Sequence, residues 1–144
     1  MISRSWLDLA LHALIVDRKR PLGEILTAYD AIEEQAVRSL SEGSNPQRIV
    51  GVQRELAVLR LTTVKQRRGE ALQARELFAR CERLGYSSED ARLTATSVFA
   101  QICLADGHPE VALGDLDDAL RSVPQGKYPR IEELARDLHA AKHQ

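Results

Sequence analysis

The chain has 144 residues, of which 44% are hydrophobic and 28% charged, and its formal net charge is −1. This composition is typical of one folded, soluble domain, and the near-zero charge gives no reason to expect nucleic acid as a partner. The chain contains only two cysteines, and no segment resembles a transmembrane helix, so we expect a cytoplasmic protein without a disulfide framework or a membrane contact.

Helical periodicity recurs along the chain, and no stretch shows the alternation typical of a β-strand. We expect a first helix over about residues 4–18, before Pro21, and a second over about 22–42, ended by Gly43. Asn45-Pro46 predicts the start of a third helix, because asparagine is a good N-cap and proline is favoured at the first helical position.

The second half continues the pattern with short connections. A fourth helix is expected over about 70–84, a fifth after Ser87 or Ser88, a sixth from Pro109 to Val123, and a last one from near Pro129. About seven helices joined in this way predict an all-α fold with antiparallel neighbours. Three surface ion pairs are expected from helical spacing, namely Glu34 with Arg38, Glu76 with Arg80, and Asp117 with Arg121.

The sequence also contains an internal repeat. Aligning Gly69 with Gly107, 38 residues later (107 − 69), places Ala74 on Ala112 and other buried-type residues on one another: Phe78 on Leu116 and Cys81 on Ala119. Small residues at matching places predict helices that approach one another closely.

With this register, residues 88–124 resemble a tetratricopeptide (TPR) repeat. Ala100 stands at the close-packed site of the first helix, Gly107 at the turn, Ala112 on the second helix and Pro124 at the end, although Thr96 and Cys103 replace the family's usual aromatics. Residues 55–86 match more weakly, and the spacing is similar to that of extended TPR variants.

The resemblance implies one TPR-like domain over residues 1–144. It would contain a degenerate N-terminal hairpin (1–43), two repeats (45–86 and 88–124) and a C-terminal capping helix (127–144).

Residues capable of chemistry are few. His139 and His143 lie one helical turn apart, as two metal ligands on a helix do, but no third ligand is placed by the sequence. Asp115, Asp117 and Asp118 form an acidic cluster that we interpret as a solvated helix face. We interpret Cys81 and Cys103 as core thiols. Because no phosphate loop, nucleophile motif or metalloprotease motif is present, we expect no enzymatic activity, cofactor or metal; a helical enzyme or metal protein is the third hypothesis.

The first hypothesis is recognition of another protein. The resemblance implies a concave groove lined by the first helices of successive hairpins, presenting Leu56, Leu59, Thr63, Gln66, Arg67, Thr94, Ser97, Gln101 and Leu104. Such a wall suits a peptide or helix of a partner protein, as in an adaptor or small chaperone. The Lys and Asn set with which some TPR domains bind a C-terminal carboxylate is missing from this sequence. Only Arg67 stands in a comparable place, which disfavours recognition of a chaperone tail.

The second hypothesis is structural. The apolar first helix, with Trp6 as an anchor, and the groove would then serve self-association into a homo-oligomer.

Overall fold

The computed structural model describes residues 20–43 and 45–143. Within these ranges the chain is all-helical and contains no strand, which confirms the all-α part of the predicted fold. The elements are α2 (Leu22–Glu42), α3 (Pro46–Gln66), α4 (Ala71–Leu84), α5 (Glu89–Ala105), the 3-10 helix η1 (Pro109–Val111), α6 (Leu113–Arg121) and α7 (Pro129–Lys142). The expected first helix and Trp6 lie outside the described residues.

Side-chain caps fix the starts of two helices as the sequence predicts. The Asn45 Oδ1 atom accepts a hydrogen bond from the Arg48 backbone N–H over 3.2 Å, with Pro46 at the first helical position. The Ser88 Oγ atom accepts from the Ala91 N–H over 3.1 Å. Each cap satisfies a backbone donor that has no partner inside its helix.

The expected sixth helix is divided. Its first turn is the 3-10 helix η1, in which Val111 N–H donates to His108 and Ala112 N–H to Pro109, each three residues back. The α-helical pattern begins only where the Leu116 N–H donates to the Ala112 carbonyl. The α-helical part, α6, is therefore much shorter than the sequence suggested.

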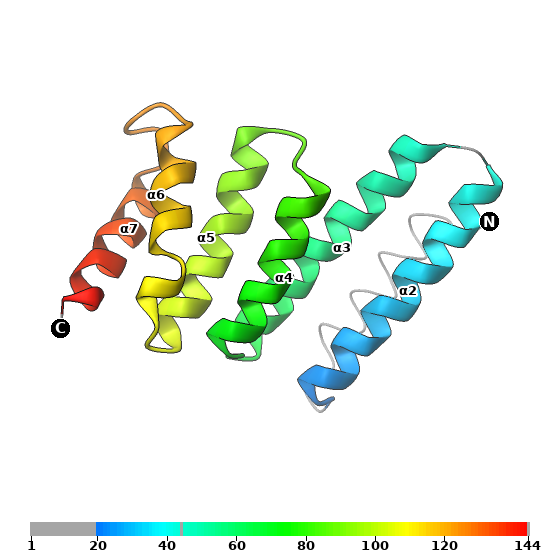
Figure 1. Ribbon diagram of the computed structural model, residues 1–144, viewed down its shortest axis with the longest axis horizontal. Coiled ribbons are helices and arrows are strands. Elements are labelled where there is room, and N and C mark those ends of the chain that lie inside the picture. The colour runs from blue at the N-terminus through cyan, green and yellow to red at the C-terminus, as the bar shows by residue number, and fades with distance from the viewer. Residues whose placement is uncertain (1–19, 44, 144) are drawn as a thin grey trace.

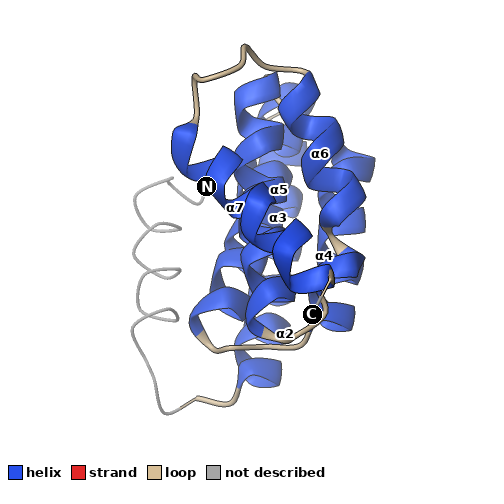
Figure 2. Ribbon diagram, turned by 90° about the vertical axis from the view of Figure 1, so that its left-hand side faces the viewer, coloured by secondary structure: helices blue, strands red, loops and turns tan. Residues whose placement is uncertain are grey.

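The helices form two layers (Figures 1 and 2). Consecutive helices run in opposite directions, and α3, α5 and α7 lie side by side in one layer while α2, α4 and α6 lie in the other. Contacts join α3 to α5 and α5 to α7 within the first of these layers. Helices α3 and α5 therefore run parallel to each other, with one of their sides on a common outer face.

The main hydrophobic core extends from α3 to α7 and contains the residues that the repeat alignment matched. Ala74, Ala100 and Ala112 have no exposed surface, and the rings of Phe78 and Phe99 stack with centroids 4.6 Å apart. Small side chains allow the helices to approach, and the stacked rings fill the space between α4 and α5.

Buried charges join the first three described helices. The Arg60 side chain of α3 is only 3% exposed, and its guanidinium donates to Glu33 Oε1 over 2.9 Å and to Asp30 Oδ1 over 2.8 Å. Arg80 of α4 binds the other oxygen of Glu33. The expectation that Arg80 pairs with Glu76 was therefore wrong, because a deeper carboxylate from α2 reaches it.

The ends of α3 and α5 share one hydrogen-bonding pattern. At the end of α5, Gly107 has φ of +76° and the His108 N–H donates to the Cys103 carbonyl; at the end of α3, Arg68 has φ of +53° and Gly69 N–H donates to Val64. Both are Schellman-type terminations, in which the residue with positive φ is usually glycine. Arg68, rather than Gly69, is therefore the counterpart of Gly107.

Gly69 is required for a different reason. A Cβ atom added there would lie 2.5 Å from Val64 Cγ1. Close packing, and not a left-handed backbone, explains this glycine.

Candidate functional site

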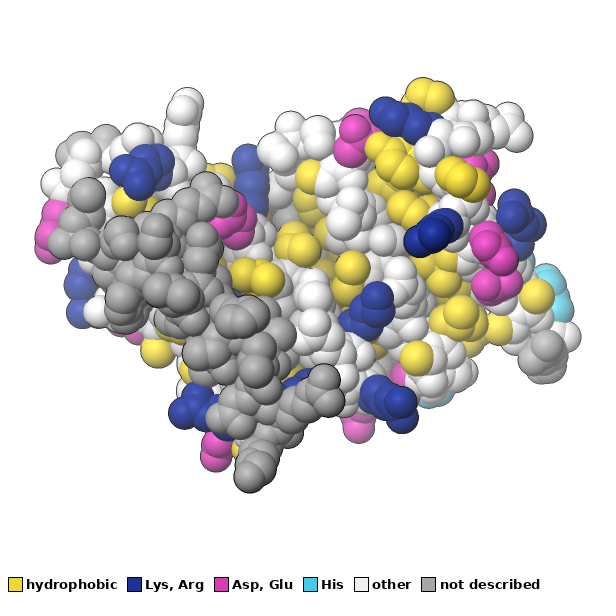
Figure 3. Space-filling view, turned by 180° about the vertical axis from the view of Figure 1, so that it is seen from behind, with side chains coloured by type: hydrophobic (Ala, Val, Ile, Leu, Met, Phe, Trp, Pro, Cys, Tyr) yellow, Lys and Arg dark blue, Asp and Glu magenta, His cyan; other side chains and the backbone are white. Residues whose placement is uncertain are grey.

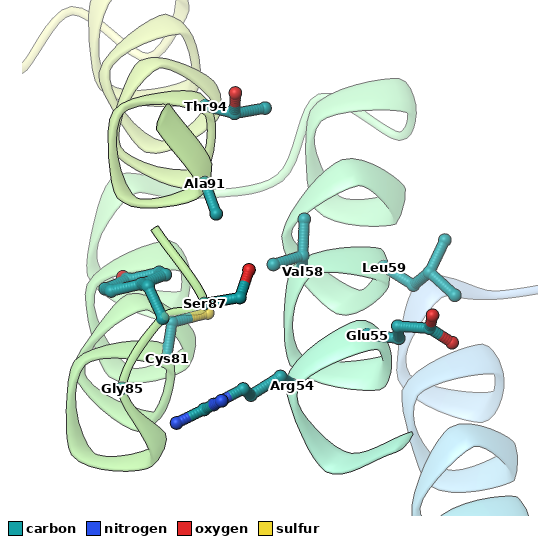
Figure 4. Close-up of a pocket in the computed structure, with 10 residues that line it drawn as sticks. Arg54, Glu55, Val58, Leu59, Cys81, Gly85, Ser87, Ala91 and Thr94 are labelled. Atoms are coloured by element: carbon teal, nitrogen blue, oxygen red, sulfur yellow. The ribbon is translucent and has the colours of Figure 1, made fainter. Parts of the chain in front are cut away.

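A pocket of about 510 Å³ opens on the outer face between α3 and α5 (Figure 4). It is lined by Arg54, Glu55, Val58, Leu59, Cys81, Gly85, Tyr86, Ser87, Ala91 and Thr94. Val58 from α3 and Ala91 from α5 face each other across it, and Ser87 projects from the connection between α4 and α5 (Figure 4). We call this the first pocket; its size is in the range of small ligand sites.

The floor of the first pocket is held by a contact between α3 and the end of α4. Arg54 Nε donates to the Leu84 carbonyl over 3.2 Å, at the point where Gly85 ends α4 with φ of +78°. Arg54 donates to a carbonyl at the negative end of the α4 dipole, and this interaction partly compensates its positive charge.

The titratable groups of the first pocket are poorly suited to chemistry at neutral pH. Burial, with a smaller contribution from Glu82, raises the pKa of the Cys81 thiol to about 11. Burial likewise raises the pKa of the Tyr86 hydroxyl. Both groups therefore keep their protons, and a protonated thiol is a weak nucleophile.

A second pocket, of about 420 Å³, lies at the C-terminal ends of the same two helices. Its lining residues are Val64, Lys65, Arg68, Gly69, Gln101, Ile102, Ala105 and Asp106. The Asp106 carboxylate accepts a hydrogen bond from the Ala71 N–H over 2.8 Å and so caps α4. Within the described part of the chain, Lys65 and Arg68 have no ion-pair partner.

Figure 3 shows the molecule from behind the view of Figure 1, the side on which α3, α5 and α7 lie. Apolar and uncharged side chains fill the middle of this side, with basic side chains among them and acidic ones mostly toward its edges (Figure 3). Such a surface can bind apolar groups while its cations attract negative charge.

Of the nine predicted groove residues, three line these pockets. Leu59 and Thr94 line the first pocket and Gln101 lines the second. Gln66 is exposed and Leu104 partly exposed, and neither lines either of these two pockets.

Four predicted groove residues have structural contacts instead. Leu56 is buried against α2, and the Thr63 hydroxyl lies 2.9 Å from the buried Tyr29 hydroxyl. Ser97 is buried and donates to the Thr94 carbonyl over 2.7 Å. Arg67 donates to the Arg20 carbonyl over 2.9 Å. The side of α3 that remains open is therefore a different one from the side predicted, because α2 covers Leu56 and Thr63.

Sequence reasoning missed several other residues that line the two pockets, among them Val58, Ala91 and Ala105. On α5, side chains that are not buried recur at helical spacing at Ala91, Thr94, Val98, Gln101 and Ala105, although Arg92 and Leu104 are partly exposed as well. This stripe of small and polar residues within an apolar helix was the available signal. On α3 no comparable stripe in the sequence pointed to Val58, Lys65 and Arg68.

The histidine and aspartate residues that the sequence suggested as metal ligands or acids lie on α6, on α7 or directly after α7. His139 Nε2 lies 3.0 Å from Asp117 Oδ2, so this histidine holds α7 against α6. Asp118, and not Asp117, pairs with Arg121, over 2.6 Å. Burial, and then the charge of Asp118, raises the pKa of Asp115. No group of three or more possible metal ligands is found among the described residues.

Comparison with known proteins gives no match: no family model, curated protein or solved structure matches this chain. Among the helices of the described ranges, none combines the length and apolarity that crossing a membrane requires.

Proposed function

We propose that this protein is a non-catalytic, TPR-like interaction module that binds a peptide or helix of a partner protein on the face formed by α3, α5 and α7. The observation that carries the proposal is that two pockets lie on this face between the same pair of helices. The role would be that of an adaptor or small chaperone.

The pattern of helix contacts supports the TPR-like part of the proposal. Helix α4 packs against both α3 and α5, while α3 also packs against α5 and α5 against α7. Stacked helical hairpins have this connectivity, because the first helix of each hairpin packs against the first helix of the next. The fully buried Ala74 and Ala112, 38 residues apart, add the close approach that such hairpins need.

The chemistry of the pockets supports binding rather than catalysis. Val58 and Ala91 give the first pocket apolar walls, and its Cys81 thiol stays protonated. The Thr94 hydroxyl donates to the Asp90 carbonyl over 3.0 Å and can still accept a hydrogen bond from a peptide N–H, and the Gln101 amide can both donate and accept. Apolar pockets combined with neighbouring amide and hydroxyl groups are typical of peptide recognition.

Selection of ligands from a random-peptide display library tests this proposal. The full chain is the target, and each selected peptide is then measured against Thr94→Arg, which fills the mouth of the first pocket from an exposed position. Thr27→Arg, at an exposed position of α2, is the matched control. We expect Thr94→Arg to weaken binding at least about tenfold and Thr27→Arg to leave it unchanged. Equal affinity for both variants, or no selected peptide, would contradict the proposal.

A further inference from the structure

The two pockets are aligned along one axis. On α3, Val58 lines the first pocket and Lys65, seven residues later, lines the second. On the parallel α5, Thr94 lines the first pocket and Gln101, also seven residues later, lines the second. Seven helical residues rise about 10 Å. A ligand lying along α3 and α5 would therefore meet the two pockets in sequence, about 10 Å apart.

The pockets differ in charge. In the first pocket Val58 and Ala91 form apolar walls, and the two charged lining residues are of opposite sign: Glu55, and Arg54, which is bonded to the end of α4. In the second, Lys65 and Arg68 have no ion-pair partner in the described part of the chain, whereas the one carboxylate there, Asp106, is engaged by the Ala71 N–H. The second pocket therefore has unused positive charge, which attracts an anion.

Arg68 is also held at a position where glycine is favoured. Its φ of +53° is left-handed, while the equivalent position at the end of α5 is Gly107. A strained backbone is an observation from which a functional role can be inferred. Here the strain retains a guanidinium beside the second pocket.

We propose that the partner segment is both apolar and acidic: a large apolar side chain occupies the first pocket and the side-chain carboxylate of an Asp or Glu binds Lys65 and Arg68. This inference rests on the proposed function and specifies its partner. The 10 Å separation corresponds to about three residues in an extended peptide and about seven in a helical one. The spacing of the two residues in the partner thus reports its bound conformation.

The test uses synthetic peptides with one Trp and one Glu in an otherwise neutral sequence, with both ends blocked so that the Glu side chain is the sole carboxylate. The spacing between Trp and Glu is varied, and affinity is followed by Trp fluorescence. We expect tightest binding at a spacing of about three or about seven. Replacing Glu by Gln should weaken binding about fivefold or more, and added salt should weaken the Glu peptide but not the Gln peptide.

Reversing the charges of Lys65 and Arg68 on the protein gives the most discriminating test of the acidic partner. The double variant Lys65→Glu with Arg68→Glu should lose the Glu peptide and gain affinity for the same peptide with Lys in place of Glu. Arg48→Glu, an exposed reversal elsewhere on α3, should do neither. Circular dichroism shows that each variant remains folded.

The outcomes separate the two proposals. Peptides that bind this face with no preference for Glu over Gln, or with a preference for Lys, would overturn the acidic partner and leave the interaction module standing. Affinity that does not depend on spacing would overturn the two-pocket geometry. If no Trp peptide binds and the display selection also fails, both proposals fall.

Discussion

Arg68 at the end of α3 and Gly107 at the end of α5 occupy the same place in two equivalent helix terminations, with φ of +53° and +76°. In each case the next residue donates its N–H to a carbonyl five residues back, Val64 or Cys103. A non-glycine side chain in this backbone region costs about 1–2 kcal/mol. The chain keeps arginine in a place that would be more stable with glycine.

Arg68→Gly is therefore expected to stabilise the protein by about 1 kcal/mol, measured as the free energy of unfolding in urea. The converse change, Gly107→Arg, should destabilise it by a similar amount, since a Cβ at Gly107 meets no atom within 4 Å and backbone strain is the main effect. On our account Arg68→Gly also weakens binding of the acidic peptide. A loss of stability in Arg68→Gly would show that its side chain contributes to the fold.

Glu33 is expected to matter far more than its neighbour Glu34. Glu33→Ala leaves the buried Arg60 with Asp30 alone and Arg80 without its carboxylate, and breaking a buried ion pair in this way costs about 3–5 kcal/mol. The predicted pair of Glu34 with Arg38 is present over 2.8 Å, but Glu34 is 71% exposed. Glu34→Ala should change the free energy of unfolding by less than about 0.5 kcal/mol. Equal effects would refute the importance of the buried network.

Ala112→Leu should overpack the contact among α5, α6 and η1. Ala112 has no exposed surface, so added methylene groups must displace neighbours, at a cost of about 1–3 kcal/mol. Gly114→Ala, two residues further on, is the matched control: a Cβ there meets nothing within 4 Å, and the change should stabilise α6 by about 0.5–1 kcal/mol. Thermal melts of both variants measure the difference, and a neutral Ala112→Leu would mean that the helices separate easily here.

Alkaline pH should destabilise the protein in part through Cys81. The pKa of this thiol rises from 9.0 to about 11 on folding. The unfolded chain therefore loses the proton first, and the stabilisation, complete below about pH 9, is lost as pH rises toward about 11. In that interval stability should fall more steeply in the wild type than in Cys81→Ala, by on the order of 1 kcal/mol per pH unit. Parallel curves from urea unfolding at each pH would contradict this cause.

Local signals in the sequence were sufficient for much of the fold. Asn45-Pro46 and Ser88 fix helix starts through bonds within a single turn, and Ala74 and Ala112 are small in a register that helical periodicity reveals. The buried pairing of Glu33 with Arg60 and Arg80 joins three helices, and no local spacing indicates it.

The candidate site was predictable only in part, for a similar reason. Thr94 and Gln101, which the register of the repeat assigned to the groove, line the two pockets. On α3, Leu56 and Thr63 were assigned to the groove, but Ile25 and Tyr29 of α2 pack against that side of the helix. Which side of α3 remains open depends on a neighbour's position, and periodicity within α3 does not contain that information.

The most direct test of the central claim is a map of peptide-induced chemical shifts in the protein's NMR spectrum. A blocked peptide with Trp and Glu at the best spacing is titrated into the full chain. We predict saturable shifts for the amides of Val58, Lys65, Thr94 and Gln101, with the exposed side of α4 and α6 unaffected. Saturable shifts confined to the α2, α4 and α6 layer, or none at all, would contradict the assignment of recognition to the face between α3 and α5.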